Sequence, residues 1–189
     1  MVTRTLLILL VLVLGVGNAA ATGPWQVEAK GRYGWPKAQA GGTELFKSSY
    51  GGEILVANRV HDNWSIAAGY NYLRMEATGA FRGDYSLTNG VLEENGYRQQ
   101  AAFALVRFHF QDNVLHPHFA AGMGAGKIHH AQGGGGFDGW GTDWLARLGL
   151  AYHAGERWRI LTEASYDVLQ GQQTNVSTFA VNLGVGYAF

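Results

Sequence analysis

The chain ends in a stretch of strict two-residue alternation, VSTFAVNLGVGYAF (176–189). Large apolar side chains occupy every second position, at Phe179, Val181, Leu183, Val185, Tyr187 and Phe189. The positions between them hold small or polar side chains. A period of two predicts a β-strand with one apolar face. A soluble sheet and a membrane-spanning wall would both alternate in this way, so the pattern leaves open whether the apolar face contacts a protein core or lipid.

The N-terminal residues have the layout of a secretory signal peptide. Arg4 precedes an apolar run over residues 6–17, and three alanines follow, ending at Ala21. The run is shorter than the roughly 20 residues that a membrane-spanning helix needs, which argues against a membrane anchor. We therefore expect residues 1–21 to be removed after export, with residues 22–189 forming a single domain. The sequence contains no Cys, so it offers no disulfide and no acylated N-terminal cysteine.

The composition limits the partners that the chain can attract. Lys and Arg together number 14, as do Asp and Glu, so no net charge draws the protein to nucleic acid. The mean hydropathy is close to zero, as in a soluble protein. Transmembrane β-barrels give the same value, because each lipid-facing side chain alternates with a polar one that faces the interior.

Alternation with a period of two recurs along the whole chain after residue 24. It defines eight segments, at 25–35, 48–59, 64–74, 97–110, 117–128, 142–154, 158–168 and 176–189. Each is about 10 to 14 residues long, enough for a tilted strand to cross a bilayer. We find no amphipathic helix of useful length among them.

The connections between these segments come in two alternating kinds. Those at 60–63, 111–117 and 154–157 are short, whereas those at 36–47, 75–96, 129–141 and 169–175 are longer and polar or Gly-rich. Bacterial outer-membrane barrels have short periplasmic turns and longer outer loops. The pattern therefore predicts that both termini lie on the periplasmic side.

Aromatic side chains gather near the two ends of the apolar face. The predicted girdles are made by Trp25, Trp35, Trp64, Trp144, Trp158, Tyr70, Tyr152 and Tyr166. Between them the face is mostly aliphatic, which matches a bilayer flanked by two headgroup regions. A soluble core would instead place its large rings in the middle. Because an open sheet edge is costly in hydrocarbon, the last strand must pair with the first. We predict an all-β fold, an eight-stranded antiparallel up-and-down transmembrane β-barrel.

The final residues carry the most specific signal. In GVGYAF, a terminal Phe189 follows apolar residues at alternate positions, Tyr187 and Val185. The chain thereby resembles the small eight-stranded outer-membrane β-barrel proteins, the class of opacity-type surface antigens and of the outer-membrane protein A barrel domain. The resemblance implies that the C-terminal strand is read by the barrel-assembly machinery. It also implies a location in a Gram-negative outer membrane, in contact with the lipid bilayer and lipopolysaccharide.

Charged residues occupy the opposite, inward face of the predicted strands. They are Glu28, Lys30, Arg32, Glu53, Arg59, Arg107, Arg147, Arg159, Glu163 and Asp167. An eight-stranded barrel is just wide enough for side chains to fill its interior. We expect a structural network of ion pairs that plugs the lumen, with Glu53, Arg107, Arg147 and Glu163 near mid-height. The alternative is a narrow selective pore.

Catalysis is the main alternative function, in the form of a lipid-modifying enzyme that acts on acyl chains of lipid A or phospholipids. Such a site needs a nucleophile, a base and an orienting carboxylate within hydrogen-bond reach. His153, Ser165 and Glu163 fall on neighbouring strands, but His153 and Ser165 fall at different heights. We therefore predict no catalytic residues and no cofactor.

A metal site is not predicted either. HPH (116–118) falls at a short turn and HH (129–130) at the start of a long loop, and adjacent residues of a strand point to opposite faces. A metal site usually gathers three or four ligands. We expect these histidines to be solvated or interfacial.

Two long loops, 75–96 and 129–141, are the candidate surface for an extracellular ligand. The first contains RGD (82–84), a triplet that resembles an integrin-binding motif and is short enough to occur by chance. The second contains four consecutive glycines (133–136) but is no phosphate-binding loop, because Lys127 precedes the glycines and no helix follows. A soluble ligand-carrying barrel is a third alternative. It would need an apolar lumen and a polar exterior, the reverse of the faces described above.

Overall fold

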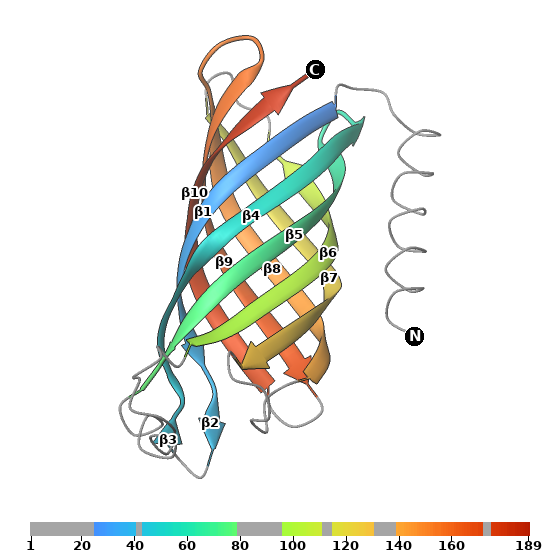
Figure 1. The fold of residues 1–189 in the computed structure, drawn as a ribbon. Helices are drawn as coiled ribbons and strands as arrows, with labels where there is room; N and C mark the ends of the chain where they lie inside the picture. The colour runs from blue at the N-terminus through green and yellow to red at the C-terminus, as the bar shows by residue number, and fades with distance from the viewer. Residues whose placement is uncertain (1–24, 41–42, 79–95, 111–114, 131–138, 172–174) are drawn as a thin grey trace.

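The computed structural model describes residues 25–40, 43–78, 96–110, 115–130, 139–171 and 175–189. Eight antiparallel strands close into a barrel in the order β1-β10-β9-β8-β7-β6-β5-β4 (Figure 1). Their bounds are β1 Trp25–Lys37, β4 Phe46–His61, β5 Trp64–Ala77, β6 Gly96–His109, β7 Leu115–His130, β8 Gly139–His153, β9 Trp158–Gly171 and β10 Asn175–Ala188. The predicted all-β, eight-stranded barrel is confirmed. In the part of the chain covered by the structure, no helix is long and apolar enough to cross a membrane.

The barrel closes through its first and last strands. Strand β1 pairs with β10 from Gln26↔Ala188 to Lys37↔Ser177. The terminal Phe189 continues the seam, since its backbone N–H donates to the carbonyl oxygen of Trp25 at 2.9 Å. Closure satisfies the backbone groups that an open sheet edge would leave unpaired in lipid.

The faces of the barrel are inverted relative to those of a soluble protein. Aliphatic side chains are among the most exposed in the molecule: Ile54, Leu148 and Leu183 have 61%, 62% and 64% of their surface accessible. Charged side chains are buried, with Glu28 at 0% and Arg147 at 2%. Along β1, burial alternates residue by residue. This arrangement excludes a soluble carrier, because a wall of exposed Ile and Leu is stable only in contact with lipid.

The connections at one end of the barrel, here called the short-turn end, are brief. Strands β4 and β5 are separated by Asp62 and Asn63, and β8 and β9 by residues 154–157. The latter turn contains Gly155, whose φ of 136° suits glycine. The turn between β6 and β7 is shorter than predicted, because β7 already begins at Leu115.

The opposite end, here called the long-loop end, differs from expectation in two respects. The predicted loop 36–47 contains a small hairpin of β2 (Gln39–Ala40) and β3 (Thr43–Glu44), which extends beyond the barrel in Figure 1. The predicted loop 169–175 is mostly strand, since β9 and β10 leave only residues 172–174 between them. The connections are therefore sorted by length less cleanly than the sequence pattern indicated.

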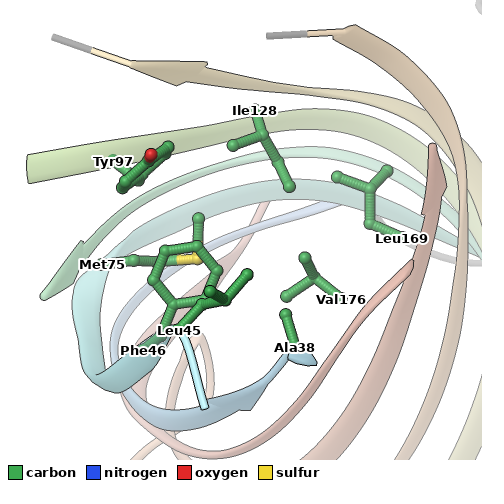
Figure 2. Packing of buried hydrophobic residues seen from close by; sticks show 8 residues of the cluster. All are labelled: Ala38, Leu45, Phe46, Met75, Tyr97, Ile128, Leu169 and Val176. Atoms are coloured by element: carbon green, nitrogen blue, oxygen red, sulfur yellow. The ribbon is translucent and has the colours of Figure 1, made fainter. Parts of the chain in front are cut away.

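An apolar cluster fills the interior near the long-loop end. It comprises Ala38, Leu45, Phe46, Met75, Tyr97, Ile128, Leu169 and Val176, which point toward one another in Figure 2. The rings of Phe46 and Tyr97 meet edge to face at 5.2 Å. Two backbone hydrogen bonds pin the connecting segment over the cluster, from Leu45 N–H to Ala38 and from Thr78 N–H to Leu45. The interior is therefore polar only in part. Apolar side chains can fill it by close packing as well as polar ones can.

Candidate functional site

The interior holds a network of six charged side chains, here called the central charge network. Its members are Glu28, Lys30, Glu53, Arg107, Arg147 and Glu163, contributed by β1, β4, β6, β8 and β9. All six side chains are 2% exposed or less. Alternation along each strand turns these long polar side chains inward, where the narrow barrel brings them together.

Two arginines make forked contacts with glutamates on distant strands. Arg147 on β8 donates from Nη1 and Nη2 to the two carboxylate oxygens of Glu53 on β4, both at 2.6 Å. Arg107 on β6 donates in the same way to Glu28 on β1, at 2.5 and 2.9 Å. Paired parallel bonds of this kind combine charge with fixed geometry, which makes them among the strongest side-chain contacts.

Lys30 connects the two forked ion pairs into one network. Its Nζ lies 2.9 Å from Glu28, 3.5 Å from Glu53 and 2.8 Å from Glu163. Glu163 in turn lies 3.5 Å from Arg107 and 3.7 Å from Arg147. Three cations face three carboxylates, so the network carries no net charge and crosses the interior from wall to wall.

A further ion pair lies nearer the long-loop end. Arg32 donates to Asp167, and both side chains are buried. Asp143 is also fully buried, yet neither carboxylate oxygen has a hydrogen-bond partner among the described residues. Asp143 was not predicted to belong to the network, although it occupies the same face of β8 as Arg147.

His118 is a further buried contact that the sequence analysis missed. Its Nε2 lies 2.9 Å from Glu163 Oε1, and the side chain is fully enclosed. The expectation of a solvated histidine at a turn is wrong, because Pro117 and His118 lie within β7 and pair with Leu150 and Gly149. A Cβ at Gly149 would lie 2.7 Å from this imidazole nitrogen and 2.6 Å from Glu163 Cγ. Glycine therefore leaves the space that the contact needs.

Arg59 and Arg159 lie near the short-turn ends of β4 and β9. Both are half-buried and line a small pocket at the short-turn end. Arg159 Nη1 donates to Gln26 Oε1 at 2.6 Å, and Gln26 Nε2 donates to Glu28 at 2.9 Å. The same pocket contains Ser65, whose Oγ lies 2.9 Å from His109 Nε2.

The Ser65–His109 contact resembles part of a catalytic triad and was not predicted; both side chains are buried inside the barrel. No Asp or Glu is among the described residues that line the pocket. The pair therefore lacks the carboxylate that orients the base in a triad. Ser165 and His153 are far apart, as predicted: Ser165 pairs with Arg147, six residues along β8 from His153. The ring of His153 packs against His116 at 4.5 Å instead.

Metal ligands do not cluster in the part of the chain that the structure describes. No group of three or more His, Cys, Asp or Glu side chains there could hold an ion. The absence of a metal or other cofactor stays a prediction.

The aromatic residues assigned to girdles lie on the outer wall. Trp64 contacts Phe108 at 4.9 Å and Trp158 contacts Tyr187 at 4.9 Å, both near the short-turn end. Near the other end, Trp35 stacks on Phe179 at 6.0 Å. Three further members, Trp144, Tyr152 and Tyr166, are also exposed on the wall. Two differ from the expected pattern: Trp25 is half-buried, and Tyr70 lies halfway along β5, between Ile54 and Ala102.

The C-terminal residues Val185 and Phe189 point outward and are well exposed. Between them, the Tyr187 hydroxyl accepts a hydrogen bond from Arg157 at 3.2 Å. Recognition of this end by an assembly machinery stays a prediction. The predicted signal peptide (1–21), the RGD triplet (82–84) and the four glycines (133–136) lie outside the described residues, as do most of the predicted loops 75–96 and 129–141.

A closed barrel with ionised groups inside and an aliphatic, aromatic-edged wall outside defines the class of transmembrane β-barrels of the bacterial outer membrane. The chain belongs to the family described as the outer membrane protein beta-barrel domain, which it matches over residues 6–189. No curated protein matches the chain.

Solved structures of outer-membrane proteins share the fold. Neisserial surface protein A is 13% identical, with 87% of this chain and 97% of that chain covered and a TM-score of 0.60. OprG from Pseudomonas aeruginosa is 12% identical, with 89% and 97% covered and a TM-score of 0.58. Ail of Yersinia pestis, solved in complex with the heparin analogue sucrose octasulfate, is 19% identical, with 89% and 100% covered and a TM-score of 0.52.

Proposed function

We propose that this protein is a non-catalytic barrel whose plugged interior blocks solute flow and which contributes to envelope integrity and to contacts at the cell surface. One observation carries the proposal: the central charge network spans the interior between opposite walls. Removing any member would leave a buried charge without its partner, so opening a path through the network is costly. This cost favours a plug over a selective pore.

Conductance tests the plug directly. Purified protein inserted into planar bilayers should give no stepwise single-channel currents, whereas a water-filled porin inserted under the same conditions should. Reproducible current steps from this protein, with folding verified by heat-modifiable gel mobility, would contradict the plug and favour the pore.

The non-catalytic part of the proposal rests on the site geometry. Among the described residues that line their pocket, Ser65 and His109 have no orienting carboxylate, and they face the interior rather than the lipid. Lipid A and phospholipids from cells with and without the protein should therefore have the same mass spectra. A protein-dependent loss or gain of an acyl chain would establish the enzyme instead.

The orientation in the membrane is also part of the proposal. We place both termini and the short-turn end in the periplasm, after export by the signal peptide and folding of residues 22–189 as one domain. Because the chain has no Cys, single cysteines can report topology. Glu44→Cys, in the hairpin of the long-loop end, should react with a membrane-impermeant maleimide in intact cells. Asp62→Cys should react only after the outer membrane is opened; the reverse result would invert the orientation.

Surface recognition is assigned to the loops 75–96 and 129–141, which the proposed orientation presents outside the cell. Ail was solved with a heparin analogue, so a sulfated polysaccharide is a sensible first probe. Cells that display this protein should bind a heparin-coated surface more than cells that lack it. Replacing residues 80–94 with a short Gly-Ser linker should abolish the difference. Equal adhesion of both strains would contradict recognition of this ligand.

A further inference from the structure

A groove on the outer wall, here called the wall groove, lies where β1, β4 and β5 run side by side (Figure 1). Its volume is about 520 Å³, and its floor is the directly opposed pair Gly31 and Gly52. Gly31 is the middle residue of β1, so the groove lies at mid-height on the lipid-facing wall. The residues that border it are Ala29, Ile54, Tyr70 and Tyr72.

The packing of the barrel itself does not require glycine at the floor of the groove. A Cβ at Gly31 would have its nearest neighbour at 3.8 Å and one at Gly52 at 3.5 Å, which are ordinary contact distances. At the adjacent Gly51, by contrast, a Cβ would collide with the carbonyl oxygen of Tyr72. The two floor glycines therefore leave a hollow that larger side chains would fill without disturbing the strands.

Tyr70 borders the groove at an unusual depth for a tyrosine. The sequence pattern predicted it in an aromatic girdle, but it lies halfway along β5 and is 47% exposed on the wall. Among the described residues, its hydroxyl has no hydrogen-bond partner, and neither has that of Tyr72.

This depth decides between a lipid chain and a protein as the occupant of the groove. A hydroxyl without a partner is costly in hydrocarbon. The headgroups lie about 12 Å from the middle of an apolar band about 25 Å tall, too far for a tyrosine at mid-height to reach. An acyl chain has no polar group at this depth, so it would fill the groove and leave the hydroxyl of Tyr70 unsatisfied. A protein surface can supply the missing partner.

The shape of the wall around the groove favours a second copy of the same protein. Leu183, which pairs with Gly31, is 64% exposed, and Ile54 at the border is 61% exposed. A hollow beside projecting side chains is self-complementary about a two-fold axis, because each copy offers the projection that the hollow of the other accepts. Small residues at an interface within a membrane also let two backbones approach closely.

From this combination we infer that the wall groove is a self-association surface, on which a second copy of this protein packs within the membrane. The projecting Ile54 and Leu183 of one copy fill the hollow of the other. The hydroxyls of Tyr70 and Tyr72 hydrogen-bond across the interface. This surface is on the side of the barrel, so the inference is independent of the plugged interior and of recognition by the loops.

Energy transfer between labelled copies tests the inference. The mature protein is labelled with a donor or an acceptor at Asp62→Cys, an exposed turn position, and refolded into phosphatidylcholine vesicles at a series of protein-to-lipid ratios. Transfer should rise to a plateau with increasing ratio and fall when unlabelled wild type is added. Gly52→Leu or Gly31→Leu fills the groove and should weaken association by about tenfold, since the backbones no longer approach. Tyr70→Phe removes only the hydroxyl and should weaken it by about threefold, the usual effect of one hydrogen bond within a membrane.

Ala121→Leu is the matched control, because it adds apolar bulk at an exposed position of β7, which lies opposite β1 in the ring of strands. It should associate as the wild type does, and heat-modifiable gel mobility verifies folding of every variant. A second measurement uses a short bismaleimide in the same vesicles: Ile54→Cys should give crosslinked dimers and Ala121→Cys should not.

Three results would overturn the inference. A wild type that stays monomeric at every ratio would leave the groove to lipid chains. Wild-type association of both folded glycine variants would place the contact elsewhere; if neither variant folds, equal crosslinking at Ile54→Cys and Ala121→Cys would do the same. In cells, a crosslink from Ile54→Cys only to a chain of another mass would assign the groove to a different protein.

Discussion

Arg147 and Glu53 form a forked ion pair across the full width of the barrel, with both hydrogen bonds at 2.6 Å. Their strands, β8 and β4, are four places apart in a ring of eight and therefore face each other. The contact joins opposite walls rather than neighbouring strands. It fixes which charged groups meet at mid-height.

Loss of this pair should destabilise the barrel strongly. We expect Arg147→Ala to lower the free energy of unfolding by about 3–5 kcal/mol, because Glu53 would remain buried with its forked partner removed. The midpoint of the heat-induced gel shift should fall accordingly. An unmoved midpoint would show that the ion pair does not contribute to stability.

Two further variants distinguish the effect of losing the Arg147–Glu53 ion pair from the effect of losing any arginine. Arg157→Ala removes an exposed guanidinium and should leave the midpoint unchanged. Replacing both partners, with Arg147→Met and Glu53→Leu, should recover much of the lost stability, since no charge of the pair then remains unmatched.

Replacing Asp143 with asparagine should affect stability differently from replacing Asp167 with asparagine. In the part of the chain that the structure describes, neither oxygen of the buried Asp143 has a hydrogen-bond partner, so Asp143→Asn removes a charge that is costly to bury. We expect its unfolding midpoint to equal or exceed that of the wild type. Asp167→Asn breaks the contact with Arg32 and should lower the midpoint. Urea titrations of the two variants in lipid vesicles would compare them, and a marked loss of stability in Asp143→Asn would contradict the interpretation.

The lipid-facing wall can be tested along a single strand. Leu183 is 64% exposed and pairs with Gly31 and Thr162 near the middle of the barrel. We expect Leu183→Arg to cost about 2–4 kcal/mol in vesicles, the usual cost of arginine near the bilayer midplane. Ser177→Arg, six residues away on the same face of β10 and near the long-loop end, should cost little. Equal costs at both positions would contradict the predicted depth.

The terminal residue should matter more for assembly in cells than for the finished fold. Deleting Phe189 removes one backbone hydrogen bond at the seam and the terminal residue of the predicted signal for the assembly machinery. We expect a large drop in folded protein in the outer membrane but near-normal refolding from urea into detergent. Phe110→Ala, which removes another exposed aromatic side chain at the short-turn end, serves as control. Normal assembly of the deletion variant would contradict the signal.

The alternation of apolar and polar side chains was sufficient to predict the barrel. A period of two indicates strands, and the apolar side chains indicate which face of each strand contacts lipid. Parity along the chain assigns Glu53 and Arg147 to the interior, but it says nothing about which charge meets which. That depends on the stagger between strands, and hence on the register of all eight pairings. The Arg147–Glu53 contact could therefore not be predicted from local patterns.

Two predictions were wrong although the sequence contained the information needed to correct them. The tripeptide HPH (116–118) was assigned to a short turn and its histidines were expected to be solvated or interfacial, although the predicted strand segment 117–128 already included Pro117 and His118. Proline is tolerated near the beginning of a strand, and both residues lie in β7. Met75, Leu169 and Val176 share the inward face with the polar residues, so the apolar cluster was signalled by parity. It was overlooked because the interior was expected to be polar throughout.

The strands are longer than a bilayer requires. Strands of 13 to 16 residues, tilted by about 40°, rise roughly 35 Å or more along the barrel axis, against an apolar band about 25 Å tall. Roughly 10 Å of the hydrogen-bonded wall therefore extends beyond the hydrocarbon and forms a rigid ring, here called the collar. With the orientation proposed above, part of that collar would act as a pedestal that lifts the recognition loops toward the sugar layer of the cell surface.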